Sequence, residues 1–204
     1  FLQEKGWDIE NESNQTNEIW KIRRNNNSSL PWLSFEKTPS PSISLGTLSI
    51  STPAEFSMIN DNLNADFVLN DSIDLSSLGN LTQSAINGTF TGTLDGQGFT
   101  VSDLALDTEN GEDVVGLFKE LGSGVSIENV NIDGFSITGN GSSSNNFGIL
   151  AGRVDGASDV MISNLNVTNS SISNARNSGG LIGGINNSDV EIRNLTNHAR
   201  LDLR

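Results

Sequence analysis

Two short motifs alternate along the second half of the chain, and this alternation constrains the fold more than any other feature. The first motif reads apolar-x-apolar-x-(Asn or Asp)-apolar-x-apolar, and four segments carry it: 99–106, 125–132, 160–167 and 190–197. Their first residues lie 26, 35 and 30 positions apart. The second motif recurs every 32 residues, at 115–118, 147–150 and 179–182. Such an alternation predicts a coil with at least two strands per turn, stacked as a solenoid.

The first motif describes two strands joined by a one-residue corner. Val125 and Ile127 fall on one face of an extended chain, as period-2 alternation requires. The alternation slips by one residue at Asn129, so the next apolar residues also point inward. Asn and Asp tolerate the left-handed backbone conformation that such a corner needs. The predicted corner residues of successive coils are Asp103, Asn129, Asn164 and Asn194.

Stacked coils would bring these corner residues within about 4.8 Å of one another, the spacing of neighbouring strands. Their side chains would then hydrogen-bond along the stack as a ladder. The alternative is a set of four independent turn formers. Neither arrangement supplies a catalytic group.

A short helix is predicted upstream of the repeats, within residues 52–63. Thr52 is suited to cap it, Pro53 to occupy its first position and Glu55 to complete a capping box. Apolar residues recur on one helical face, at Phe56, Ile59 and Leu63. We expect this helix to cover the first coil, because the end of a solenoid exposes strand edges.

Composition excludes several classes of function. Only 34% of the residues are hydrophobic and 21 are Gly, which suits a narrow core that runs along a stack. The net charge of −14 argues against binding to nucleic acid or anionic lipid; it favours solubility, with cation binding as the alternative. There is no Cys, and no apolar run approaches the ~20 residues of a membrane span.

The chain divides into three parts. Residues 1–37 hold all three tryptophans, 38–46 form a linker rich in Pro and Ser, and 47–204 form the repeat region. Because the chain starts at Phe1 without a signal peptide, it is interpreted as a mature product or an excised fragment.

Parts of this sequence resemble the GLUG-motif repeat regions of bacterial secreted and surface proteins. Residues 179–185, Gly-Gly-Leu-Ile-Gly-Gly-Ile, look like the GLUG motif itself. The stretches 50–56, 67–75 and 90–101 resemble the module that precedes such repeats, and 6–9, 19–22 and 30–33 resemble the segment that closes an array. The resemblance implies an all-β, right-handed parallel β-helix with a short N-terminal capping helix, in an adhesin-like protein. Residues 115–121 depart from the motif because they lack its later glycine.

Few residues are candidates for catalysis. His198 is the only histidine, so no His-based triad, dyad or multi-His metal site can form within the chain. Glycoside hydrolysis needs a facing pair of carboxylates. Asp71, Asp74 and Asp95 are the first candidates, but Asp95 lies in a Leu-Asp-Gly-Gln-Gly turn. We therefore predict no catalytic, cofactor-binding or metal-binding residues and no cofactor.

Two further features carry little functional signal. The acidic stretch Glu109–Asp113 is either a solvated loop or a weak cation site, because the calcium-binding repeat and EF-hand spacings are absent. Glycosylation sequons are frequent, among them Asn80, Asn87, Asn140, Asn166 and Asn194. In a chain so rich in Asn and Ser, most sequons are expected by chance.

Two functions remain open. The first is a non-enzymatic structural or adhesive module of a secreted or cell-surface protein. Its expected partners are neighbouring copies or modules, arranged head to tail, with surface glycans or a host or cell-surface protein as further candidates. In this hypothesis the N-terminal residues 1–37 of one copy cover the last coil, 189–204, of the next, whose apolar edge at Val190, Ile192 and Leu195 is exposed in an isolated copy. The alternative is that residues 1–37 fold back on their own solenoid. The second is a carbohydrate-active β-helix resembling a polysaccharide lyase or hydrolase. Nucleic-acid binding and membrane insertion are not expected.

Overall fold

The computed structural model describes residues 46–108, 112–139, 141, 146–176 and 178–203, together with the backbone of four residues nearer the N-terminus. The chain forms two compact units, 1–44 and 45–204. In the first unit, β1 (Ile22–Arg23) pairs in antiparallel fashion with β2 (Trp32–Leu33). The predicted linker, 38–46, lies outside the described residues except for Gly46, and so do most of residues 1–37.

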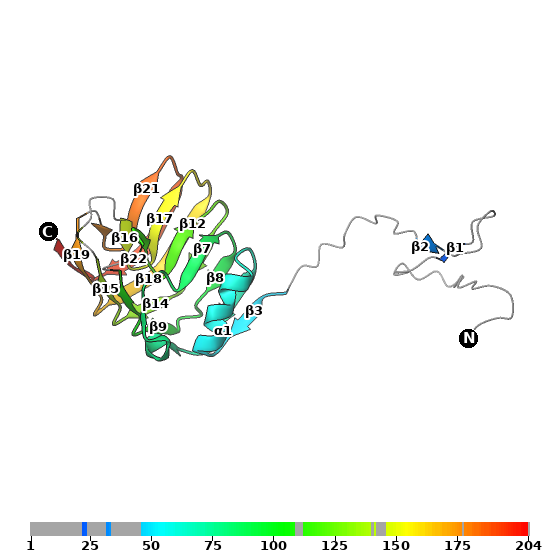
Figure 1. The fold of residues 1–204 in the computed structure, drawn as a ribbon, viewed down its shortest axis with the longest axis horizontal. Helices are drawn as coiled ribbons and strands as arrows, with labels where there is room; N and C mark the ends of the chain where they lie inside the picture. Colours follow the sequence, from blue (N-terminus) through cyan, green and yellow to red (C-terminus); the bar gives the residue numbers. More distant parts are fainter. Residues whose placement is uncertain are drawn as a thin grey trace. The chain divides into compact units, whose positions relative to one another are not determined.

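The second unit is a parallel β-solenoid of about four turns, as predicted (Figure 1). Each strand inside the stack pairs with its equivalents in the coils before and after it, and the strands at the ends of a column pair on one side. The first column of paired strands contains β3 (Leu48–Ile50), β4 (Asp66–Leu69), β8 (Thr93–Asp95), β13 (Ser126–Glu128), the first half of β18 (Val160–Thr168) and the first half of β22 (Val190–Asn197). The second column contains β5 (Ile73–Asp74), β9 (Thr100–Ser102), β14 (Asn131–Asp133) and the second halves of β18 and β22.

Three further columns complete each turn. The third contains β6 (Asn80–Leu81), β10 (Ala105–Asp107), β15 (Ser136–Thr138), β19 (Ser171–Ala175) and β23 (Arg200–Leu203). The fourth contains β7 (Ile86–Phe90), β12 (Phe118–Leu121), β17 (Ala151–Asp155) and β21 (Ile182–Asn186). The short fifth column contains β11 (Val114–Val115), β16 (Asn146–Gly148) and β20 (Ser178–Gly179).

The core is a set of apolar stacks that run along these columns. Ile127 pairs in register with Leu94 below it and Ile162 above it, and all three side chains are buried. Both halves of the motif point inward as predicted, since all eight of these side chains are at most 1% exposed: Val125, Ile127, Val130, Ile132, Val160, Ile162, Leu165 and Val167. Aromatic rings extend the core toward the first coils, with ring centroids of Phe90 and Phe118 4.9 Å apart.

The expected register of the first repeat segment, 99–106, is wrong. Val101 pairs with Ile132 rather than with Ile127, and the true partner of Ile127 is Leu94. The cause is a longer corner, in which residues 96–99 separate β8 from β9 where only 129–130 separate β13 from β14. This insertion moves segment 99–106 to the second and third columns.

The pairing of the second motif also differs by one residue from the predicted register at its last occurrence. Val115 pairs with Phe147 as its spacing predicts, but Gly148 rather than Phe147 pairs with Gly179. The glycines of the GLUG-like stretch follow from close packing between coils. A Cβ on Gly183 would lie 2.5 Å from the carbonyl oxygen of Gly152 in the coil beneath, a distance that real Cβ atoms do not reach.

The predicted helix forms, and it lies at one end of the stack (Figure 1). It is shorter than expected, because α1 (Pro53–Ser57) passes directly into the 3₁₀-helix η1 (Met58–Asp61). A second 3₁₀-helix, η2 (Leu75–Leu78), lies in the first coil. A variant of the capping box is present: Thr52 Oγ1 accepts from the Glu55 N–H at 3.2 Å, and Glu55 Oε2 accepts at 2.8 Å from the N–H of Ser51, the residue before the N-cap. Phe56 and Ile59 are completely buried against the solenoid.

Candidate functional site

The corner asparagines form the predicted ladder. Asn129, Asn164 and Asn194 adopt φ values of 56°, 51° and 49°, the left-handed conformation expected at a one-residue corner. Asn164 Nδ2 donates to Asn129 Oδ1 at 2.8 Å, and Asn194 Nδ2 donates to Asn164 Oδ1 at 2.8 Å. Every rung therefore has the same direction, with each amide donating to the coil before it.

The base of the ladder is Asp95 rather than the predicted Asp103. Asn129 Nδ2 donates to Asp95 Oδ1 at 2.9 Å, and the Gln97 N–H donates to the same oxygen at 2.9 Å. The Gln97 side-chain amide donates to Asp95 Oδ2. Burial acts to raise the pKa of Asp95, but these hydrogen bonds outweigh it and lower the pKa below its usual value of 3.8. An ionised carboxylate accepts hydrogen bonds but has no proton to donate. Because each ladder amide donates to the coil before it, the ladder begins at Asp95.

Asp103 belongs to a different corner, between the second and third columns. Its φ is 57°, and its carboxylate lies beside Gly134 of the next coil. In that coil Asp133 Oδ1 accepts from the side chains of Thr168 and Asn169 of the following coil, at 2.6 Å and 2.7 Å. The hydrogen bond from Thr168 lowers the pKa of Asp133 most, and the one from Asn169 lowers it further. Burial opposes both with a smaller effect. Stacked coils thus hold two separate sets of polar corner contacts.

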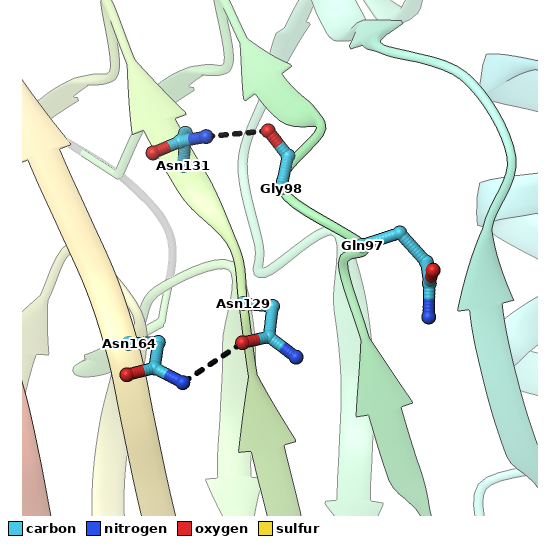
Figure 2. A pocket seen from close by; sticks show the side chains of 5 residues that line it. All are labelled: Gln97, Gly98, Asn129, Asn131 and Asn164. Atoms are coloured by element: carbon cyan, nitrogen blue, oxygen red, sulfur yellow. Dashed lines mark hydrogen bonds between the residues drawn. The ribbon is translucent and has the colours of Figure 1, made fainter.

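An open depression of about 430 Å³ lies beside the ladder, lined by Gln97, Gly98, Asn129, Asn131 and Asn164 (Figure 2). Asn131 Nδ2 donates to the Gly98 carbonyl at 2.7 Å, and the Asn129–Asn164 rung forms the opposite side. Amides donate and accept hydrogen bonds but are neither nucleophiles nor proton carriers near neutral pH. The lining can therefore bind polar groups, and it supplies no catalytic base or acid.

The sequence contained a signal for the true ladder base. Asp95 precedes Asn129 by 34 residues, close to the 35 that separate Asn129 from Asn164, whereas Asp103 precedes Asn129 by only 26. Gln97 and Asn131 gave no such signal, because each reaches its partner through the conformation of the longer corner.

The three candidate catalytic carboxylates make structural hydrogen bonds. Asp71 Oδ1 accepts from the adjacent Ser72 N–H at 2.7 Å, and Asp74 Oδ1 caps η2 by accepting from the Ser76 N–H at 2.8 Å. The hydrogen bonds from Ser76 lower the pKa of Asp74. Asp95 is held in the ladder. All three candidate carboxylates therefore accept hydrogen bonds from residues near them in the fold.

The remaining sequence candidates are spread over the surface. Residues 109–111 of the acidic stretch lie outside the described part of the chain, and Glu112 forms an ion pair with Lys119. Within the part that the structure describes, no three His, Cys, Asp or Glu side chains gather to hold a metal ion. His198 is exposed, as expected of a bystander.

The sequons fall in different environments. Asn80 and Asn194 are exposed, while Asn87 and Asn166 are half-buried within strands. Asn140 lies outside the described residues.

The last coil presents an apolar edge. Of the three side chains predicted to be exposed there, Val190 is half-buried, whereas Ile192 and Leu195 are exposed. These side chains are 40% and 38% exposed, although their equivalents Ile162 and Leu165 in the preceding coil are buried. Three apolar residues that sequence reasoning did not name extend the edge: Ile185, Leu201 and Leu203. Each continues a stack of the core, so the edge has the composition of the interior rather than of a surface.

Comparison with known proteins gives one informative similarity. No family model matches the sequence, and no solved structure matches it. Halomucin of Haloquadratum walsbyi (strain DSM 16790 / HBSQ001) is 34% identical over 143 residues, which are 69% of this chain and 1% of halomucin. The chain thus spans about a hundredth of that relative's length. None of the described helices is long and apolar enough to cross a bilayer. The similarity to halomucin, a large surface protein, together with the β-solenoid, fits the surface repeat region that the sequence pattern indicates.

Proposed function

We propose that this chain is a non-enzymatic structural module of an extracellular surface protein, and that it assembles with neighbouring copies or modules head to tail. The observation that carries the proposal is the open last coil. Its side chains continue the buried stacks of the solenoid yet remain 38–49% exposed at Ile185, Ile192, Leu195, Leu201 and Leu203. Further stacking buries such an edge, and contact between unlike ends propagates as a filament.

Location at the cell surface is supported by two features. Halomucin is a large surface protein, and the repeated β-solenoid suits an extended stalk or filament. The net charge of −14 favours solubility and repulsion between modules along their sides. Adhesion to surface glycans or to a host or cell-surface protein would be a further property of the exposed faces.

The absence of catalysis is part of the proposal, and it rests on the state of the carboxylates. The hydrogen bonds that lower the pKa values of Asp74 and Asp95 favour the ionised forms. A general acid for glycoside hydrolysis needs the opposite shift. We expect the purified chain to show no turnover of acidic or neutral polysaccharides.

The alternative, a carbohydrate-active β-helix, is favoured by the amide-lined depression beside the ladder, since amides suit sugar hydroxyls. None of the described residues that line this depression is aromatic and able to stack on a sugar ring. Turnover that is lost in Asp71→Asn or Asp74→Asn would establish the alternative and overturn the structural proposal.

Sedimentation velocity over a concentration series tests the assembly directly. We expect the full chain to associate, and Leu203→Asp to abolish association because it places a charge on the stacking edge. Met161→Asp is the matched control: Met161 is 41% exposed, on the outer face of β18 rather than on the open edge. A monomeric wild type, or equal loss of association in both variants, would refute head-to-tail stacking through this edge.

A further inference from the structure

The longer corner at residues 96–99 adds to its coil a segment that the next two coils lack, and the amide-lined depression lies against it. Main-chain hydrogen bonds fix this segment to the next coil. The Gly98 N–H donates to the Asn129 carbonyl at 2.8 Å, and the Phe99 carbonyl accepts from the Asn131 N–H at 3.0 Å. Insertions into a regular repeat often map to the binding face. The depression therefore has a rigid wall that the regular repeat would not supply.

The lining keeps free hydrogen-bonding groups. Asn131 Nδ2 donates to the Gly98 carbonyl, but Asn131 Oδ1 accepts from no described residue (Figure 2). Gln97 Oε1 likewise has no donor among the described residues. The Nδ2 atoms of Asn129 and Asn164 each carry two hydrogens, and each gives one to the ladder. The existing hydrogen bonds hold these amides in place, so little side-chain freedom is lost when a ligand binds.

The charges beside the depression favour a neutral ligand. Asp95 adjoins the lining, because Asn129 and Gln97 both donate to its carboxylate. Glu128 lies in register with Asp95 on the neighbouring strand, and these two carboxylates disfavour an anion. A hard cation takes about six to eight oxygen ligands. Both oxygens of Asp95 already accept N–H groups, and no third acidic side chain joins the pair among the described residues.

We propose that the depression is a non-catalytic binding site for a neutral saccharide. A side-chain amide presents a donor and an acceptor side by side, which matches two neighbouring hydroxyls of a sugar ring. A peptide would need apolar pockets for its side chains, and the described lining residues form none. This inference goes beyond the stacking role and does not rest on it, because the lining belongs to three successive coils inside the stack.

An NMR titration of the full chain tests the site with three neutral probes: maltotriose, cellotriose and mannotriose. We expect at least one of them to shift the side-chain amide signals of Asn129 and Asn131. Binding should be weak, because no described lining residue offers an aromatic ring for a sugar to stack on. If none of the three probes shifts these signals, the proposal is overturned.

Two variants at equivalent positions localise the binding. Asn131→Ala removes the unpaired acceptor and should weaken saccharide binding several-fold. Asn166→Ala is the matched control, since Asn166 pairs in register with Asn131 one coil later and does not line the depression. It should bind as the wild type does, and equal affinities of the two variants would contradict the site. Gln97→Ala tests the opposite wall with the same several-fold loss expected, and the position keeps its positive φ of 52°.

The class of ligand is tested by comparison with an anionic and a peptidic probe. Trigalacturonate should bind several-fold more weakly than the best neutral trisaccharide. Glu128→Gln should reduce this difference and leave the binding of the neutral probe unchanged, because Glu128 does not line the depression. Tighter binding of trigalacturonate would refute the preference for a neutral ligand. Triglycine that produces the same shifts at equal concentration would refute the assignment to saccharides.

The outcomes separate this inference from the proposed function. If the chain associates in sedimentation but binds none of the neutral probes, the saccharide site fails and head-to-tail stacking stands. If a probe binds with the expected loss in Asn131→Ala while the chain stays monomeric, the site stands and stacking fails. Mass spectrometry of the recovered trisaccharide should show it intact. Cleavage would overturn the non-catalytic assignment in favour of the carbohydrate-active alternative.

Discussion

The two ends of the solenoid face the same physical problem and differ in how the described residues meet it. At the first coil, Asn60 acts as a short substitute for a strand: its Nδ2 donates to the Ala85 carbonyl at 2.9 Å, and its Oδ1 accepts from the Asn87 N–H at 2.8 Å. Both groups belong to the edge of β7 or adjoin it, so one amide satisfies a donor and an acceptor there. Phe56 and Ile59 cover the apolar stacks.

The last coil has neither device among its described residues. Its apolar stacks end in side chains that are partly exposed, and its ladder ends in the acceptor Asn194 Oδ1. Asn197 interrupts an apolar column there, and its Oδ1 accepts from the nearby Ala199 N–H at 2.9 Å. The difference teaches that a closed end needs both apolar cover and a polar group that mimics the missing strand. The last coil has neither among its described residues, which is the arrangement that the proposed stacking requires.

The largest expected effect compares the interior of the stack with its open edge. Ile162→Asp places an unpaired charge among buried side chains and should cost at least about 4 kcal/mol of unfolding free energy, enough to unfold much of the protein. Ile192→Asp occupies the equivalent position one coil later, where the side chain is 40% exposed, and should cost about 1 kcal/mol. Urea denaturation followed by circular dichroism measures both. At protein concentrations where the chain is monomeric, equal destabilisation by the two variants would show that the last coil is covered within its own chain.

The sequence predicted the stacks of the core well, because each depends only on local alternation. Val125, Ile127, Val160 and Ile162 were assigned correctly from period-2 patterning. The register of the first coils was not, because the corner at 96–99 is longer than the others and shifts the apparent period. An insertion within a repeat can be detected from the sequence only when two spacings are compared. Here the spacing of Asp95 from Asn129 would have shown the longer corner.

The closing contacts at the first coil could not be read from the sequence. Asn60 reaches residues 25 and 27 positions away, and nothing in its local sequence marks it apart from the other asparagines. The helix itself was predictable from Thr52, Pro53 and Glu55, but its early passage into a 3₁₀-helix was not. Tertiary contacts, rather than intrinsic propensity, decide these features.

Removal of the Asn60 side-chain amide, which takes the place of a neighbouring strand, is expected to have the next largest effect on the unfolding free energy. Asn60→Ala loses its two hydrogen bonds to Ala85 and Asn87 at the edge of β7 and a third to the Ser57 carbonyl, which should lower the unfolding free energy by about 1–3 kcal/mol. Asn64→Ala removes an exposed asparagine from the same connection and should change it by less than about 0.5 kcal/mol. Chemical denaturation of both variants gives the comparison. If Asn60→Ala were as stable as Asn64→Ala, the amide would not be closing this end.

Two substitutions compare the middle of the ladder with its open end. Asn164→Gly removes two rungs, whereas Asn194→Gly removes one. Glycine adopts a positive φ without strain, and its greater entropy in the unfolded chain affects both variants alike. We expect losses of about 1–3 kcal/mol for Asn164→Gly and about 0.5–1.5 kcal/mol for Asn194→Gly. Equal losses would mean either that the rungs contribute little or that Asn194 has a second partner in solution.

The smallest effect concerns pH and the base of the ladder. Because hydrogen bonds from Asn129 and Gln97 lower the pKa of Asp95 below 3.8 in the folded state, its ionised form is favoured more in the folded than in the unfolded chain. That contribution to stability is present above the unfolded-state pKa and is lost as the pH falls through the lower, folded-state pKa. Asp95→Asn keeps an oxygen that accepts from Asn129 but does not titrate, so its unfolding free energy should fall less steeply between about pH 5 and pH 2. Asp74 and Asp133 continue to titrate in the variant, which leaves part of the acid sensitivity in place. Asp202→Asn removes an exposed carboxylate outside the ladder and controls for net charge. Denaturation curves that depend on pH identically in wild type and Asp95→Asn would contradict the assignment of Asp95 as the ionised base on which the ladder is built.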